Sequence, residues 1–169
     1  MDNRNKSSEG EELIGEYLGA EGIDFKSEEK IENLKNDNIP YRKADFYLPQ
    51  YKAYVEFLGL WNVEKNREQY KEKQRVYAEN NIPCIYLYPD NLGILNFIFK
   101  RRLKNELKKH DMKWELLKLN WNIFQEKYAL AVFVFILMLF FVDNLIAKII
   151  LGLLFIWHLI TGIKSTFFK

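Results

Sequence analysis

The hydrophobic and polar positions of this chain follow two successive patterns. Up to about residue 102, apolar residues recur at helical spacing in some segments and in short runs or alternation in others. From residue 128 to residue 163 the sequence is mostly apolar, with Asp143 and Asn144 separating two runs and Lys148 and His158 lying inside the second. The pattern predicts a globular N-terminal part followed by long apolar helices.

Helical spacing and turn residues predict the elements of the N-terminal part. Ser8 is suited to cap a first helix, and residues 49–51 form a link of hairpin length between two strands. The predicted helices cover 9–20, 63–80 and 91–102, and the predicted strands cover 43–48, 52–58 and 84–88, with another extended segment beginning at 23–25. This order is typical of an α/β fold, a mixed β-sheet flanked by helices, over residues 8–102. The polar residues 1–7 are expected to be disordered.

Two apolar runs, 128–142 and 145–163, predict a transmembrane helical hairpin over 121–163. A spanning helix needs roughly 20 apolar residues, and one helix across both runs would be about 54 Å long, well beyond the roughly 30 Å hydrocarbon core. A hairpin places both ends on one side. By the positive-inside rule the flanking Lys and Arg make that side cytoplasmic, including a tail over 164–169. A buried hairpin in a soluble protein and a shallow re-entrant hairpin are the alternatives.

Charge is divided unevenly along the chain. Residues 1–99 hold 13 Lys and Arg against 18 Asp and Glu, a net charge of −5, whereas residues 100–169 hold 12 against 5, a net charge of +7. A basic juxtamembrane helix is predicted over 103–120. The cations expected to contact anionic lipid are Lys100, Arg101, Arg102, Lys104, Lys108 and Lys109. Contact with nucleic-acid phosphates is the alternative for the same stretch.

Composition excludes several classes of site. Cys84 is the only cysteine, so no intramolecular disulfide can form. Two histidines, His110 and His158, are too few for a histidine-rich metal site. The chain also has no glycine-rich phosphate loop of the kind that ATPases use.

Asp45 and Glu56 are the candidate metal ligands. Asp45 belongs to Ala-Asp-Phe-Tyr-Leu-Pro and Glu56 to Tyr-Val-Glu-Phe-Leu-Gly, two predicted strands joined by a hairpin. The two carboxylates are therefore expected at neighbouring strand positions. Hard oxygen ligands of this kind suit Mg²⁺ or Mn²⁺, and such a site commonly hydrolyses a phosphodiester. Two ordinary solvent-facing carboxylates are the alternative.

Lys73 lies in the middle of the apolar stripe of the helix predicted over 63–80. It comes three residues after Tyr70 and four before Tyr77, so its side chain is expected to face the sheet. A lysine in that position needs a carboxylate, a phosphate or a metal-bound oxygen nearby. The alternative is a lysine whose stem packs and whose amine reaches solvent.

With these residues in place, the segment 8–92 resembles the PD-(D/E)XK, or restriction-endonuclease-like, nuclease superfamily. The resemblance is carried by Ala-Asp-Phe-Tyr-Leu-Pro followed by Val-Glu-Phe-Leu-Gly. It implies that Asp45 and Glu56 hold the metal, with the backbone carbonyl of Phe57 as a further ligand.

The resemblance also implies roles for an acid on the first helix and for a lysine. The acid matches Glu11 better than its neighbour Glu12. The motif lysine is missing, because Leu58 occupies its position. Some members of the superfamily are similar in supplying a lysine from the next helix, which makes Lys73 the first candidate here and Arg75 the second.

The sequence thus predicts a membrane-anchored, Mg²⁺-dependent endonuclease on the cytoplasmic face, with DNA as the expected nucleic acid. The rival hypothesis is a catalytically degenerate nuclease-fold adaptor that recruits a partner or nucleic acid to the membrane. Leu58 and the negative charge of the first 99 residues favour this rival, since DNA-binding domains are usually basic. A membrane protein whose hairpin does the main job, and a homodimer, stay open as well.

Overall fold

The computed structural model describes residues 8–167, and the chain divides after Glu115 into two compact units. The elements of the first unit are α1 (Glu9–Ala20), β1 (Lys26–Glu32), β2 (Tyr41–Leu48), β3 (Ala53–Phe57), α2 (Glu64–Glu79), β4 (Cys84–Leu87), the 3-10 helix η1 (Pro89–Ile94) and α3 (Leu95–Lys109). Two long helices follow, α4 (Lys113–Phe141) and α5 (Leu145–Phe167). The segment 1–7, predicted to be disordered, and residues 168–169 lie outside the described residues.

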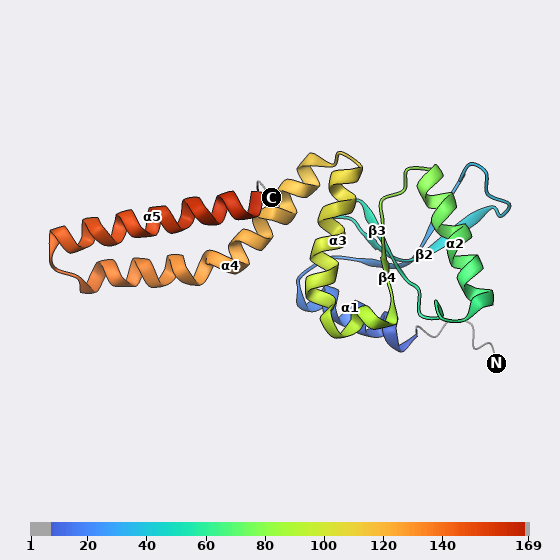
Figure 1. Ribbon diagram of the computed structural model, residues 1–169, viewed down its shortest axis with the longest axis horizontal. Helices are drawn as coiled ribbons and strands as arrows, with labels where there is room; N and C mark the ends of the chain where they lie inside the picture. Colours follow the sequence, from blue (N-terminus) through green and yellow to red (C-terminus); the bar gives the residue numbers. More distant parts are fainter. Residues whose placement is uncertain (1–7, 168–169) are drawn as a thin grey trace. The chain divides into compact units, whose positions relative to one another are not determined.

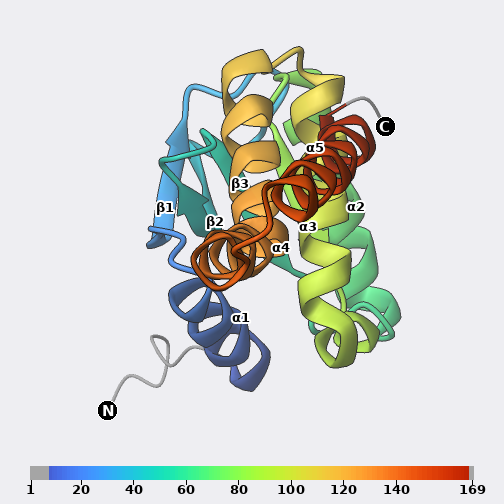
Figure 2. The same ribbon diagram turned by 90° about the vertical axis from the view of Figure 1, so that its left-hand side faces the viewer.

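The four strands form one mixed sheet in the order β1-β2-β3-β4. β1, β2 and β3 are antiparallel neighbours, whereas β4 runs parallel to β3 and is reached through α2. In Figure 1, α2 and α3 flank the sheet on opposite sides, and α1 packs beside α3. Figure 2 shows the same ribbon turned by 90° about the vertical axis. The predicted α/β class, with a mixed sheet flanked by helices, is confirmed.

The first helix begins where its sequence predicts. The Glu11 amide donates to the Ser8 hydroxyl oxygen, and the Ser8 amide donates to the Glu11 carboxylate, which completes a capping box. Gly10 lets α1 approach β3 closely, because a Cβ at this position would lie 2.2 Å from Cε1 of Phe57. The start of α1 is thereby held against the C-terminal end of β3.

The first strand differs from the prediction. The extended segment expected to begin at 23–25 precedes the strand, which is rich in charged residues and has Ile31 as its one buried residue. Glu28 in its middle adopts the left-handed conformation with φ 57°. β1 lies at an edge of the sheet, and an edge strand carrying charged side chains lacks the apolar alternation that marks a half-buried strand.

The closing helix predicted over 91–102 begins later and runs further. Residues 89–94 form η1, and α3 follows it. Phe99, Leu103 and Leu107 are spaced four residues apart and are all fully buried. Burial of this stripe extends the helix well past the predicted end.

The prediction of a single basic helix over 103–120 is wrong. Its first part belongs to α3, and α4 begins at Lys113 after a break at 110–112. The physical reason is the burial of Leu103 and Leu107, which makes this part of α3 a piece of the globular unit. That unit accordingly extends to Glu115.

The six cations expected at anionic lipid all lie on α3, in differing surroundings. Lys100 forms an ion pair with Glu21 at 2.7 Å. Arg102 donates a hydrogen bond to the Tyr86 carbonyl and lies over the ring of Tyr88. These two side chains therefore hold the globular unit together.

In the second unit, α4 and α5 are each long and apolar enough to cross a membrane. They lie side by side and antiparallel, joined through residues 142–144 (Figure 1). The rings of Phe135 and Phe155 stack with centroids 4.1 Å apart, and Gly162 packs against Tyr128, where a Cβ would lie 2.4 Å from Cζ. The turn lies where the sequence predicts, but α5 continues through the beginning of the predicted tail.

Candidate functional site

The end of the β2–β3 ladder brings two acids together. The ladder ends with Phe46 paired to Val55, and Asp45 and Glu56 are the next residue on each strand. Asp45 Oδ2 accepts a hydrogen bond from the Phe57 amide at 2.6 Å. The carboxylate thus continues the contact between the strands where the backbone pairing stops. The two acids that the sequence predicts as neighbours are neighbours in the structure.

Glu56 is only 2% exposed, and both of its carboxylate oxygens accept hydrogen bonds. Lys73 Nζ donates to Oε2 at 2.6 Å, and the Tyr77 hydroxyl donates to Oε1 at 2.9 Å. A buried carboxylate is tolerated only with such partners, because removing an isolated charge from water is costly.

Lys73 reaches the site from α2, the helix on this side of the sheet. Its Nζ also donates to the backbone carbonyl of Lys43 on β2 at 2.7 Å, and its side chain is 18% exposed. Tyr77, one turn further along α2, lies on the same face of the helix and is fully buried. The amine therefore points inward, as the helical spacing predicts.

The other two lysine-related expectations concern Arg75 and Leu58. Arg75 lies on the outer surface of α2 and pairs with Glu72 at 2.7 Å and with Glu79 at 2.5 Å, so the second candidate is not part of this site. Leu58 is buried, and its amide donates to the Leu87 carbonyl at 2.7 Å. Position 58 therefore contributes no charged group to the site. Among residues 8–167, Lys73 supplies the only amine that contacts Glu56.

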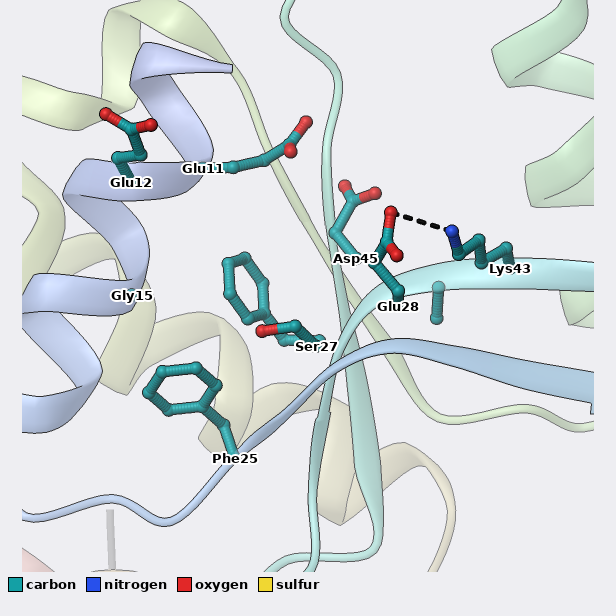
Figure 3. A pocket seen from close by; sticks show the side chains of 10 residues that line it. Glu11, Glu12, Gly15, Phe25, Ser27, Glu28, Lys43 and Asp45 are labelled. Carbon is teal, nitrogen blue, oxygen red and sulfur yellow. Dashed lines mark ion pairs between the residues drawn. The ribbon is translucent and has the colours of Figure 1, made fainter. Parts of the chain in front are cut away.

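A pocket of about 390 Å³ opens between α1, β1 and β2 (Figure 3). Asp45 lines it together with Glu11, Glu28 and Lys43. In Figure 3 the Glu11 carboxylate points toward Asp45, whereas Glu12 points away from it. Both candidate acids of the first helix line the pocket, and Glu11 is the one whose carboxylate points toward Asp45.

Burial weakens the acidity of both central carboxylates. It raises the pKa of Asp45 from 3.8 to about 6; the Phe57 amide and Lys73 oppose this shift, and Glu11 adds to it. Burial likewise raises the pKa of Glu56 from 4.5 to about 7, against the effect of Lys73 and with the effect of Asp45. A site that disfavours its own negative charge gains from binding a cation.

The residues at the site partly fit a divalent cation. Within the described part of the chain, no three His, Cys, Asp or Glu side chains are grouped as metal ligands. Mg²⁺, however, is usually held by one or two carboxylates together with waters and substrate phosphates. Asp45 and Glu56 would be those two carboxylates. Asp45 Oδ1 has no hydrogen-bond donor among residues 8–167, whereas both oxygens of Glu56 accept a hydrogen bond from the protein. The donor set suits Mg²⁺ or Mn²⁺ completed by solvent and substrate.

Three contributions to the site escaped the sequence. The Tyr77 hydroxyl fixes the Glu56 carboxylate, and its place four residues after Lys73 on one helical face was the available signal. The Lys43 carbonyl holds the lysine amine, which no side-chain pattern could indicate. The third is Gly10, whose missing side chain brings α1 close to β3.

Comparison of the chain with known protein families, with curated proteins and with solved structures finds no significant match. The functional conclusion therefore depends on the sequence motif and on the geometry described above.

Proposed function

We propose that this chain is a membrane-anchored, Mg²⁺-dependent nuclease that hydrolyses phosphodiester bonds, with DNA as the expected substrate. The observation that carries the proposal is the ion pair between Lys73 Nζ and Glu56 Oε2 at 2.6 Å, beside Asp45. Through this ion pair, Lys73 provides the amine that the sequence motif lacks at position 58. The combination is the one expected of a PD-(D/E)XK site whose lysine comes from the following helix.

The arrangement of elements gives independent support. A helix, three antiparallel strands, a second helix and a strand parallel to the third follow one another in this order. The resemblance to the restriction-endonuclease-like superfamily implies a core of this kind. The two acids lie on adjacent strands of the sheet, and the first helix adds Glu11.

In the proposed mechanism, Asp45, Glu56 and the Phe57 carbonyl would hold the metal, and Glu11 would help directly or through water. A bound Mg²⁺ would supply polarisation of the phosphate and activation of a water molecule. The Lys73 ammonium stabilises the charge that grows on the phosphate in the transition state. Its position is fixed in advance by the hydrogen bonds to Glu56 and to the Lys43 carbonyl, so little reorganisation is required.

The membrane anchor is the second part of the proposal. Large apolar side chains of α4 and α5 such as Phe140, Phe141, Leu145 and Trp157 are 70% or more exposed, which suits contact with lipid rather than water. At about 35 Å, α5 is long enough to cross a hydrocarbon core of roughly 30 Å. The excess of Lys and Arg outside the apolar runs supports a cytoplasmic location for the nuclease unit under the positive-inside rule.

The full-length protein in detergent should cut nucleic acid when Mg²⁺ or Mn²⁺ is added, and chelation should stop it. Asp45→Asn and Glu56→Gln should each abolish cleavage. Glu68→Gln, which alters an exposed acid of α2 paired with Lys71, is the matched control and should leave the rate unchanged. Wild-type protein that leaves duplex, single-stranded and branched DNA and RNA intact would refute the proposal.

The adaptor remains the rival because both oxygens of Glu56 already accept hydrogen bonds from protein groups. An adaptor of this fold would retain the Lys73–Glu56 pair for stability alone. It would bind nucleic acid or a protein partner equally well with and without Mg²⁺, and no variant of Asp45 would alter that binding.

A further inference from the structure

A groove of about 620 Å³ lies next to the candidate active site, between β2 and α2. Tyr41, Arg42 and Lys43 line it from β2, and Tyr70 and Lys73 line it from α2. Lys43 also lines the pocket that contains Asp45. The groove therefore adjoins the pocket of Asp45 through Lys43, and Lys73 connects it to Glu56.

Aromatic rings are available at this groove. The Tyr41 side chain is 42% exposed, and Lys30 Nζ lies 4.8 Å from the centre of its ring. Tyr70 stacks on Trp61, with ring centroids 6.3 Å apart and an interplanar angle of 19°. The Tyr70 hydroxyl accepts a hydrogen bond from the Leu60 amide at 3.3 Å, so the loop after β3 holds this aromatic pair in place.

The charged side chains that line the groove are all basic, although the first 99 residues are net negative. Three cations and no acid line it. Each cation is paired with a carboxylate outside the lining, and the pair of Lys43 with Glu28 is exposed on both sides, at 43% and 57%. Exposed ion pairs contribute little to stability, so Lys43 is free to exchange this partner for a phosphate.

We propose that this groove binds a single-stranded segment of nucleic acid, with bases against Tyr41 and Tyr70 and phosphates against Lys43 and Lys73. Unpaired bases expose the faces that stack on aromatic rings, whereas bases in a duplex are already stacked on each other. Delivery of that strand to Asp45 rests on the proposed nuclease function. The binding itself does not.

Binding is tested with full-length protein in detergent and with excess chelator, so that no cleavage intervenes. Fluorescence anisotropy compares labelled oligo(dT), oligo(U) and a DNA duplex, each of about 12 nucleotides or base pairs. We expect both single strands to bind more tightly than the duplex. Tyr70→Leu and Tyr41→Leu should each weaken single-strand binding by about 10-fold, because they remove a stacking surface.

Matched variants separate stacking from folding. Tyr70→Phe keeps the ring and its stacking on Trp61 but loses the hydrogen bond from the Leu60 amide, so it should bind far more tightly than Tyr70→Leu. Tyr41→Phe keeps the ring and should bind as wild type does. Phe97→Leu removes a 64% exposed ring on α3 that does not line the groove, and it should also bind normally. Lys43→Met should reduce the dependence of log K on log salt by about 0.7, the value for one phosphate contact to a single strand. Circular dichroism of every variant confirms that the fold is retained.

The outcomes distinguish the two proposals. Duplex binding equal to or tighter than single-strand binding would overturn the groove, as would Tyr→Leu variants with wild-type affinity. Single-strand binding that depends on both tyrosines, without cleavage in Mg²⁺, would sustain the groove and remove the nuclease. Cleavage in Mg²⁺ that neither Tyr→Leu variant affects would sustain the nuclease and remove the groove. A difference between oligo(dT) and oligo(U) would identify the natural strand as DNA or RNA.

Discussion

Lys73 Nζ lies 2.6 Å from Glu56 Oε2, although the two residues are 17 positions apart and belong to different elements. Removing the amine while keeping the stem should therefore affect both catalysis and stability. We expect Lys73→Met to lower the cleavage rate by about 100-fold or more, the usual cost of losing one donor that stabilises transition-state charge. It should also lower the free energy of unfolding by about 1–3 kcal/mol, because Glu56 loses a buried partner.

Arg75→Met is the matched control for this change. It removes a cation from the same helix, but Arg75 pairs only with exposed groups on the outer surface. Cleavage rate and thermal midpoint are measured for both variants under identical conditions. If Arg75→Met and Lys73→Met reduce the rate equally, the inward position of Lys73 has no catalytic meaning.

The raised acid pKa values predict how stability responds to pH. Burial raises the pKa of Glu56 to about 7 in the folded protein. The folded state therefore binds this proton more tightly than the unfolded state, and the stability from protonated Glu56 is complete below 4.5 and is lost as pH rises to about 7. One pKa unit corresponds to about 1.4 kcal/mol, so the loss is a few kcal/mol.

Glu56→Gln isolates this effect, since glutamine imitates the protonated acid. The variant should match the wild type in thermal midpoint near pH 4 and become progressively more stable than the wild type up to about pH 7. A constant difference between the two proteins across this range would show that Glu56 does not titrate there.

Added Mg²⁺ should counteract the loss of stability that accompanies ionisation of the buried carboxylates. Metal binding requires ionised carboxylates, so the ion should raise the thermal midpoint at pH 8 and have little effect at pH 5, below the raised pKa values of about 6 and about 7. A ligand at 100 times its Kd stabilises by about 2.7 kcal/mol. Asp45→Asn should abolish the shift, whereas a shift that persists in this variant would place the ion elsewhere.

The contact between Gly10 and Phe57 predicts a large effect of one methyl group. A Cβ on Gly10 would lie 2.2 Å from Cε1 of Phe57, so Gly10→Ala must displace the ring or the helix. We expect a loss of about 1–3 kcal/mol, as for overpacked cores. Gly19→Ala is the control on the same helix, because nothing lies within 4 Å of its Cβ. It should stabilise by about 0.5–1 kcal/mol, the usual gain of Ala over Gly in a helix.

Thermal unfolding of the two glycine variants and of a Gly10→Ala/Phe57→Leu double variant tests the packing directly. Partial recovery in the double variant is expected, since the smaller side chain makes room. Equal effects of alanine at positions 10 and 19 would contradict the close approach of α1 to β3.

The membrane topology can be read by labelling with a maleimide that does not cross membranes. Cys84 is buried and burial raises the pKa of its thiol, so the native cysteine should stay silent. In intact cells, Asn144→Cys at the hairpin turn should react. Asn62→Cys and Ser165→Cys should react only after the membrane is opened. A re-entrant hairpin would leave all three unlabelled until then.

The sequence predicted the central site better than it predicted the edges of the fold. Asp45 and Glu56 lie in apolar runs joined by a hairpin, so strand pairing could be inferred from local pattern alone. The position of Lys73 followed from helical spacing. The extended segment expected to begin at 23–25 leads directly into β1, but the extent of β1 could not be predicted, because only Ile31 of its residues is buried and its charged side chains carry no periodic signal.

The missing parts of the site depend on tertiary packing. The Lys43 carbonyl approaches the lysine amine only after α2 has docked on the sheet. The stripe of Phe99, Leu103 and Leu107 did carry a helical signal, but the many neighbouring cations made it look like a separate surface helix. The carbonyl contact was missed because it depends on tertiary docking, and the helix boundary was misplaced because local charge was considered before long-range burial.

The capping box of α1 gives the site a natural reporter. The Glu11 carboxylate that points toward Asp45 is also the acceptor for the Ser8 amide at 3.2 Å. Any ion that draws this carboxylate into the pocket must loosen the first helical turn, whereas an ion held without Glu11 leaves it closed. Hydrogen exchange at the Ser8 amide therefore distinguishes these two modes of binding in the unmodified protein.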